Sequence, residues 1–279
     1  MKKILLTTTA LTILSGAAYA EMGVSGDARF GVTTSGGVST VDYRTRVFFK
    51  GAGETDGGLT FGAKTGLRLD DGAVSASARV IAPSLYLGNG TMTLRIGNTN
   101  GAISTASGIW NTPGVGYSGM SFGGVLFLTN SSSSTFGAGA NNVAVDFSLG
   151  TTNISLSQTN GGDVEIAASM KAGSATIGVG YDNGATTTGG TYLTAAFDAG
   201  GANIAVAYVK PTTGAASWSL GGSSAMGSGS AKAFIANIAG TSSYGIGYGA
   251  SLGGGASWGV GFESIAGVTR MEAGMNFGF

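Results

Sequence analysis

The sequence predicts an all-β fold: a transmembrane antiparallel β-barrel of about 16 strands, with one long connection folded inward. Segments that alternate apolar and polar residues recur roughly every ten to sixteen residues, with turn signals between them. The chain is apolar, with mean hydropathy +0.27 and 10% charged residues. Yet no stretch after the first twenty residues approaches the ~20 continuous apolar residues of a spanning helix. A barrel reconciles these facts, because its lipid-facing residues alternate with lumen-facing ones.

The first twenty residues have the pattern of a secretory leader. Two lysines precede an apolar run over 4–14, and small residues precede the expected cut. We expect a signal peptide over residues 1–20 that is cleaved between Ala20 and Glu21, and one barrel domain over 21–279. An amphipathic first helix is the alternative interpretation of the same run.

The first alternating segment, 22–34, sets the pattern for the rest. Phe30 and Val32 fall on one face, whereas Asp27 and Arg29 fall on the other. The segments that follow alternate in the same way and are separated by glycine-rich turns. Strands are expected near 22–34, 40–51, 59–70, 74–80, 84–88, 91–97, 120–128, 140–150, 152–160, 162–171, 173–182, 190–199, 201–210, 215–221, 230–239, 242–253, 255–264 and 267–279.

The last segment, 269–279, alternates without a break and ends on an aromatic residue, Phe279. Its apolar face carries Met271, Met275 and Phe277, and its other face carries Arg270. If the barrel closes, this segment pairs with the first one. Arg270 is then expected beside the arginine of the opening strand.

Composition excludes several classes of function. The chain contains neither cysteine nor histidine, so thiol catalysis, Cys/His zinc sites and imidazole bases are absent. The carboxylates are scattered and no pair stands out as acid and base. We therefore expect no enzyme, no cofactor and no metal site. A formal net charge of zero gives no argument for a nucleic-acid partner.

Basic residues gather in the first third of the chain. Of the 14 lysines and arginines, eight lie between residues 21 and 100, all on the polar face of their strands. With the last strand they form a candidate basic wall of a pore: Arg29, Arg44, Arg46, Lys64, Arg68, Arg95 and Arg270. They are either ordinary solvated lumen residues balanced by nearby aspartates, or they set a positive potential that selects solutes by charge.

Strand patterning fails between Gly97 and Met120, which is long for a connection in this chain. The segment is rich in small and polar residues, with aromatic residues at intervals. It is interpreted as a constriction loop inside the barrel, and an exposed surface loop is the alternative. Its candidate lining residues are Asn98, Asn100, Trp110, Asn111 and Tyr117.

Several runs resemble the alphaproteobacterial, Rhodobacter-type general-diffusion porins of Gram-negative outer membranes. They are residues 25–32, 44–49, 54–63 and 90–98, and the final strand is similar as well. The resemblance implies a sixteen-stranded barrel, a homotrimer, and a third external loop that forms the pore eyelet. It also implies that Phe279 is the signal read by the outer-membrane barrel assembly machinery.

The implied function is passive diffusion of small hydrophilic solutes and ions through a water-filled channel in outer-membrane lipid. In that family, carboxylates on the loop face the basic wall. Here no Asp, Glu, Lys or Arg occurs between Gly97 and Ala140. The eyelet is therefore expected to be basic on one side only, which favours anions.

Two other interpretations fit parts of the sequence. A structural or adhesive outer-membrane barrel without significant conductance would show the same strand pattern. A secreted glycine-rich β-solenoid would need a fixed short repeat, and we find none.

Overall fold

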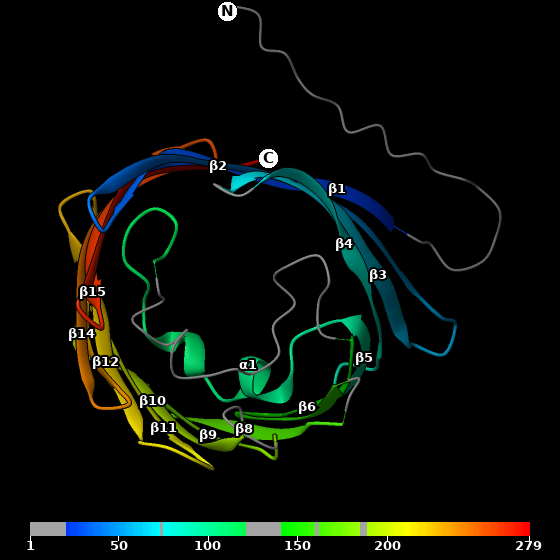
Figure 1. Cartoon of the computed structure of the whole chain (residues 1–279). Coiled ribbons are helices and arrows are strands. Elements are labelled where there is room, and N and C mark those ends of the chain that lie inside the picture. Colours follow the sequence, from blue (N-terminus) through cyan, green and yellow to red (C-terminus); the bar gives the residue numbers. More distant parts are fainter. Residues whose placement is uncertain (1–20, 73–74, 121–140, 160–161, 185–188) are drawn as a thin grey trace, which may run out of the picture.

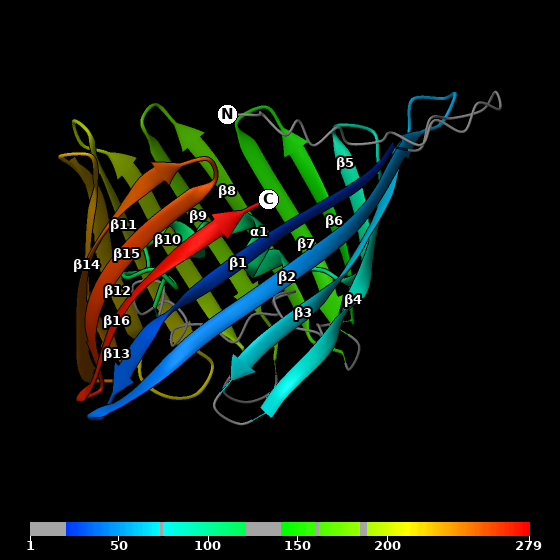
Figure 2. The same cartoon turned by 90° about the horizontal axis from the view of Figure 1, so that it is seen from above.

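The computed structural model describes residues 21–72, 75–120, 141–159, 162–184 and 189–279. Sixteen antiparallel strands follow one another round a closed barrel, and β1 pairs with β16 to complete the ring (Figures 1 and 2). The predicted fold class and strand number are confirmed. Closure pairs the backbone groups that an open sheet edge would leave exposed.

The strands match the sequence pattern closely. Their bounds are β1 (Glu21–Ser35), β2 (Val38–Glu54), β3 (Thr60–Gly72), β4 (Ser75–Gly88), β5 (Met92–Asn98), β6 (Asn141–Leu149), β7 (Thr152–Thr159), β8 (Val164–Ala172), β9 (Ala175–Asp182), β10 (Gly190–Asp198), β11 (Ala202–Pro211), β12 (Ser217–Met226), β13 (Gly229–Ile238), β14 (Thr241–Gly253), β15 (Ala256–Ile265) and β16 (Val268–Gly278). The strand expected near 120–128, apart from its first residue, and the leader up to Ala20 lie outside the described residues.

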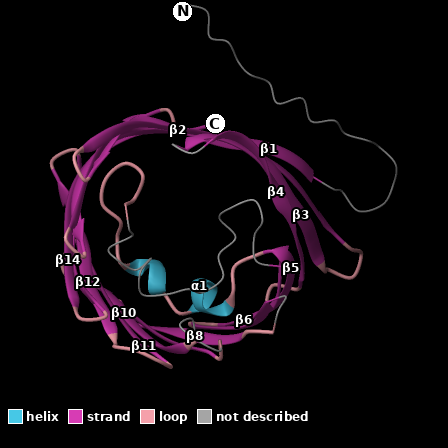
Figure 3. Cartoon of the chain, in the orientation of Figure 1, coloured by secondary structure: helices cyan, strands magenta, loops and turns pink. Residues whose placement is uncertain are grey.

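Two short helices, which the sequence pattern did not predict, follow β5. They are α1 (Ala102–Ala106) and the 3₁₀ helix η1 (Ile109–Asn111), and Figure 3 shows both inside the ring of strands. In the part of the chain that the structure describes, no helix has the length and apolar character to cross a membrane.

Alternation gives the wall two different faces. Large apolar side chains point outward and are exposed, as at Val24 (70%), Val80 (66%) and Ile246 (61%). The inner face carries the charged residues together with serines and glycines. This is the arrangement expected of a barrel with lipid outside and water inside.

Strand β4 departs from prediction because it runs through Pro83. Two strands were expected here, 74–80 and 84–88, with the proline between them. The β3–β4 register instead shifts between Lys64 and Gly66, which pair with Ser84 and Ile81. A bulge of this kind tolerates a residue that has no N–H to donate.

The closing seam corrects the prediction for Arg270. The register sets Arg29 opposite Asn276, whereas Arg270 lies opposite Ser35. Six residues of extended strand therefore separate Arg270 from Arg29, about 20 Å at the usual rise per residue. Arg270 contacts Glu263 of β15 instead, at 3.3 Å. The expectation that Arg270 lies beside Arg29 is wrong, because alternation predicts the face of a residue but not its level along the seam.

Candidate functional site

Residues 98–120, called the inner segment from here on, lie inside the barrel and follow its inner wall from β7 round to β16 (Figure 1). Ile103 and Ile109 are fully buried in a cluster with Tyr192 and Val209 of the wall. Val115 and Met120 pack with Phe234 in a second cluster. Apolar packing at both ends of the segment holds it against β7–β16.

Arg95, on β5, anchors the start of the inner segment. Its guanidinium bonds the carboxylate of Asp146 on β6, at 2.9 Å between Nη2 and Oδ1. It also donates to the Asn100 carbonyl at 2.9 Å and to the Thr105 hydroxyl at 3.0 Å. The side-chain amide of Asn98 donates to the Ala82 carbonyl at 3.2 Å. Arg95 was predicted as part of the basic wall; its contacts make it a support for the segment.

Wall residues bind the backbone of the first turn of α1. The N–H of Ala102 donates to the Ser157 hydroxyl, and the N–H of Ile103 donates to Glu165 Oε2, both at 2.8 Å. Glu165 is only 2% exposed. The first N–H groups of a helix have no partner within it, so a buried wall carboxylate satisfies one of them.

Glu272 of β16 anchors the other end. It accepts the Ser118 N–H at 2.7 Å and the Ser118 hydroxyl at 2.5 Å. Four residues further along β16, the side-chain amide of Asn276 donates to the Tyr117 carbonyl at 2.7 Å. The inner segment is thus bound through its backbone at both ends by side chains of the wall.

Tyr117 joins the inner segment to the basic wall. Its hydroxyl donates to Asp42 Oδ2 at 2.7 Å, and the same carboxylate pairs with Arg29 at 3.0 Å. Burial and the hydrogen bond to Asp42 both raise the pKa of the Tyr117 phenol above its ordinary value. At neutral pH the phenol therefore stays protonated and donates a hydrogen bond to Asp42.

Five residues of the basic wall, together with Lys50 and Arg79, form rows of cations that face one another directly across strands. Register pairs Arg29 with Arg44 between β1 and β2, and Lys50 with Lys64 between β2 and β3. A third row runs across three strands: Arg46, Arg68 and Arg79. Like charges directly opposite each other destabilise a sheet. Because these rows lower the stability of the barrel, we expect them to serve its function.

Neighbouring carboxylates neutralise part of the positive charge of these rows. Asp27 pairs with Arg44 at 3.0 Å and with Arg46 at 2.9 Å. The Lys64 ammonium lies 4.1 Å from the centre of the Phe48 ring, a cation–π contact. Lys50, Lys64 and Arg79 are exposed on the inner face, so the accessible excess on β2–β4 is positive.

Comparison with known proteins identifies the family. The family model described as Gram-negative porin matches residues 7–272. The chain belongs to the Gram-negative porins. A curated porin of Fuscovulum blasticum is 31% identical to it over 140 residues, 46% of this chain. That match spans 48% of the relative, about half of its length.

Solved structures share the fold of this porin. Two mutants of the Rh. blastica porin match with TM-scores of 0.80 and 0.81, both at 22% identity. Each match covers 92% of this chain and 100% of the other. The architecture described above is therefore the one seen in porins of that type.

The porin accommodates its inner segment on glycines of the wall. A side chain at any of these positions would collide with the segment: Gly31, Gly178, Gly180, Gly221, Gly247, Gly259, Gly261 and Gly274. At Gly261, a Cβ would lie 2.6 Å from the backbone of Gly116. We call this set the glycine track. The glycine track allows the inner segment to lie directly on the wall, with its backbone at Gly178, Gly247, Gly259 and Gly261 and with its side chains at the other four positions.

The structure brings the predicted loop residues into one segment but gives them different surroundings. Tyr117 and Asn98 are tied to the wall as described, and the partly buried Trp110 packs on the first apolar cluster. Asn111 is exposed within the barrel. Sequence reasoning missed the carboxylates Glu165 and Glu272, because no local pattern marks a strand residue that binds a distant backbone N–H.

Proposed function

We propose that this porin forms a water-filled channel for passive diffusion of small hydrophilic solutes and ions across the outer membrane, with a preference for anions. The observation that carries the charge preference is the set of opposed cation rows on β1–β4. In the barrel, each row of cations has water on one side and the low-dielectric wall and lipid on the other. Fields are stronger in such a setting than in bulk water.

The narrowest section, in this proposal, lies between the basic wall and the inner segment. Asn98, Asn100, Trp110, Asn111 and Tyr117 belong to the segment, and Arg29, Arg44, Arg46, Lys64 and Arg68 to the wall. The segment itself carries no Asp, Glu, Lys or Arg. Its side of the constriction is therefore uncharged.

Acidic residues do occur behind the inner segment, but they are shielded from the pore. Glu165 and Glu272 are 2% and 4% exposed, and both accept hydrogen bonds from the segment. Lys50, Lys64 and Arg79 are exposed on the opposite wall. Asp27 and Asp42 are partly exposed, but they are paired with arginines of the wall. The unpaired exposed cations therefore support a weak to moderate anion preference.

Single-channel recording tests the channel proposal. Detergent-purified protein added to a planar bilayer in KCl should give discrete, roughly ohmic conductance steps. A folded barrel that inserts but never conducts would support the alternative, a structural or adhesive outer-membrane barrel. We propose no catalytic role for this protein, because the proteins of its family are porins.

We propose Phe279 as the recognition signal for the assembly machinery. Its N–H donates to the Gly26 carbonyl at 3.0 Å, and its carbonyl accepts the Gly26 N–H at 2.7 Å, so its backbone also closes the seam. Its side chain is 67% exposed.

Phe279→Ala keeps both backbone bonds and removes only the ring. We expect it to lower the amount of assembled barrel in outer-membrane fractions at least about fivefold, while Phe279→Tyr assembles normally. Normal assembly of Phe279→Ala would show that the ring is not the signal.

Two further proposals follow from the family. Export should remove residues 1–20, which amino-terminal sequencing of the membrane-inserted protein would detect as a start at Glu21. The barrel should assemble as a homotrimer in outer-membrane lipid. Sedimentation of the detergent-solubilised protein measures the mass of the assembly, and a mass other than that of three chains would contradict the homotrimer.

A further inference from the structure

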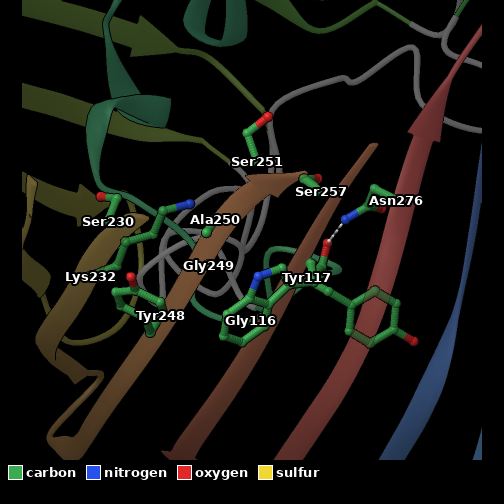
Figure 4. Close-up of a pocket in the computed structure, with 11 residues that line it drawn as sticks. Gly116, Tyr117, Ser230, Lys232, Tyr248, Gly249, Ala250, Ser251, Ser257 and Asn276 are labelled. Carbon is green, nitrogen blue, oxygen red and sulfur yellow. Dashed lines mark hydrogen bonds between the residues drawn. The ribbon is translucent and has the colours of Figure 1, made fainter. Parts of the chain in front are cut away.

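A pocket with both polar and apolar lining lies between the last part of the inner segment and strands β13–β16 (Figure 4). It encloses about 280 Å³, with Gly116 and Tyr117 on the side of the segment. The strands contribute polar side chains from four different places in the chain. They are Ser230, Lys232, Ser251, Ser257 and Asn276.

Register places these side chains on the lumen side of the wall. Lys232 is paired with Gly247, a glycine of the track that touches Gly116. Ser257 is paired with Asn276, whose amide binds the inner segment. The pocket is therefore reached from the water-filled interior and not from lipid.

Lys232 alone carries a formal charge among the described residues that line the pocket. The carboxylates of the neighbouring wall are engaged elsewhere. Glu272 binds Ser118, and Glu263 pairs with Arg270. Hydroxyl and amide groups line the pocket together with Tyr248, Ala250 and Trp258, and no acidic residue lies among the described lining residues.

We propose that this pocket is a subsite for small oxyanions, the phosphate or carboxylate group of a permeating solute. The proposal rests on the channel function above. Lys232 would supply the charge, and the hydroxyls of Ser230, Ser251 and Ser257 would donate hydrogen bonds. Asn276 uses one N–H for Tyr117 and has a second to offer.

The size of the pocket limits the solute. Pockets that enclose drug-sized ligands measure roughly 300–1,000 Å³, so this one suits a single small anion or a short-chain organic phosphate. Its place beside Tyr117 puts the subsite next to the proposed constriction. An anion drawn by the basic wall would meet a further positive charge there, because Asn276 of the pocket is paired with Arg29 of the wall.

The test measures binding of inorganic phosphate in two ways. Isothermal titration of the assembled, detergent-purified barrel gives a Kd, and phosphate-dependent reduction of single-channel KCl conductance gives a second value. We expect saturable binding to the unaltered protein. Lys232→Gln should weaken it about tenfold, as loss of a charge-assisted hydrogen bond does, and Lys232→Arg should retain most of it.

Lys171→Gln is the matched control. Lys171 shares the face of Ser169 on β8, is exposed, and does not line the pocket. Its removal subtracts the same charge from the lumen and should change the Kd less than twofold. If Lys232→Gln failed to assemble, Ser257→Ala would replace it, with an expected loss of about threefold.

The outcomes separate the two proposals. Conduction of KCl without saturable phosphate binding would overturn the subsite and leave the channel function standing. Phosphate binding without conductance would contradict the channel function and leave the subsite. An unchanged Kd in Lys232→Gln, or an equal loss in Lys171→Gln, would also overturn the subsite.

Discussion

Gly261→Val should release the inner segment from the wall and widen the channel. A side chain at this position meets Gly116 backbone at 2.6 Å and Met120 Cε at 3.0 Å. Overpacking of this kind costs about 1–3 kcal/mol, which multiplies the population of a detached segment by roughly 5–150. Displacement of Gly116 would also strain the adjoining bonds of Tyr117 and Ser118. We expect single-channel conductance to rise about twofold or more, with a larger size limit for neutral polymers.

Gly23→Val is the control for this experiment. Gly23 lies on the inner face of β1, and a Cβ there would have no atom within 4 Å. It adds the same side chain to the lumen without touching the segment, so conductance should stay near that of the unaltered protein. If both variants conduct like the unaltered protein, the glycine track does not hold the constriction in place. Gly261→Ala offers a milder version should the valine variant fold poorly.

Lys50→Glu with Lys64→Glu should move selectivity toward cations. Both lysines are exposed and are paired across β2 and β3. Their reversal leaves the ion pairs of Asp27 and Asp42 intact. In water, one charge about 7 Å from a permeating ion contributes about 0.6 kcal/mol, roughly threefold in local ion concentration at low salt. Two reversed charges should therefore bring the anion-to-cation permeability ratio below one.

Lys171→Glu with Lys210→Glu makes the same change in net charge at other places. Lys171 lies at the end of β8, and the Lys210 ammonium is exposed and donates to the Gly214 carbonyl. This control should shift the permeability ratio by less than a third of the change in the first variant. Equal shifts would mean that total charge, and not the cation rows, determines selectivity.

The sequence was sufficient to predict the barrel because alternation is a local property. Every second residue in segments such as 22–34 reports its face directly, so strand number and lumen-facing cations could be predicted. Register is not local. The position of Arg270 along the seam depends on how far β16 is staggered against β1. Alternation of apolar and polar residues does not determine that stagger.

Attachment of the inner segment could be predicted only in part. Its position inside the barrel was expected from the loss of patterning and the family resemblance. Glu165 and Glu272 lie far from the segment in sequence, and nothing local distinguishes them from other lumen acids. The glycine track did leave a partial signal. On β14 and β15, Gly247, Gly259 and Gly261 of the track fall among runs of inner-face glycines (245, 247 and 249; 259 and 261) while bulky residues face outward. That alternation indicates a wall surface reserved for close contact.

The zero-current potential across a planar bilayer with a KCl gradient tests the central claim most directly. The rows of cations on β1–β4 face an uncharged inner segment, and the acids behind that segment are buried. The unaltered channel should therefore show the sign of potential produced by chloride passing more readily than potassium, and the potential should shrink as ionic strength rises. A potential of the opposite sign, indicating cation selectivity, would contradict the account.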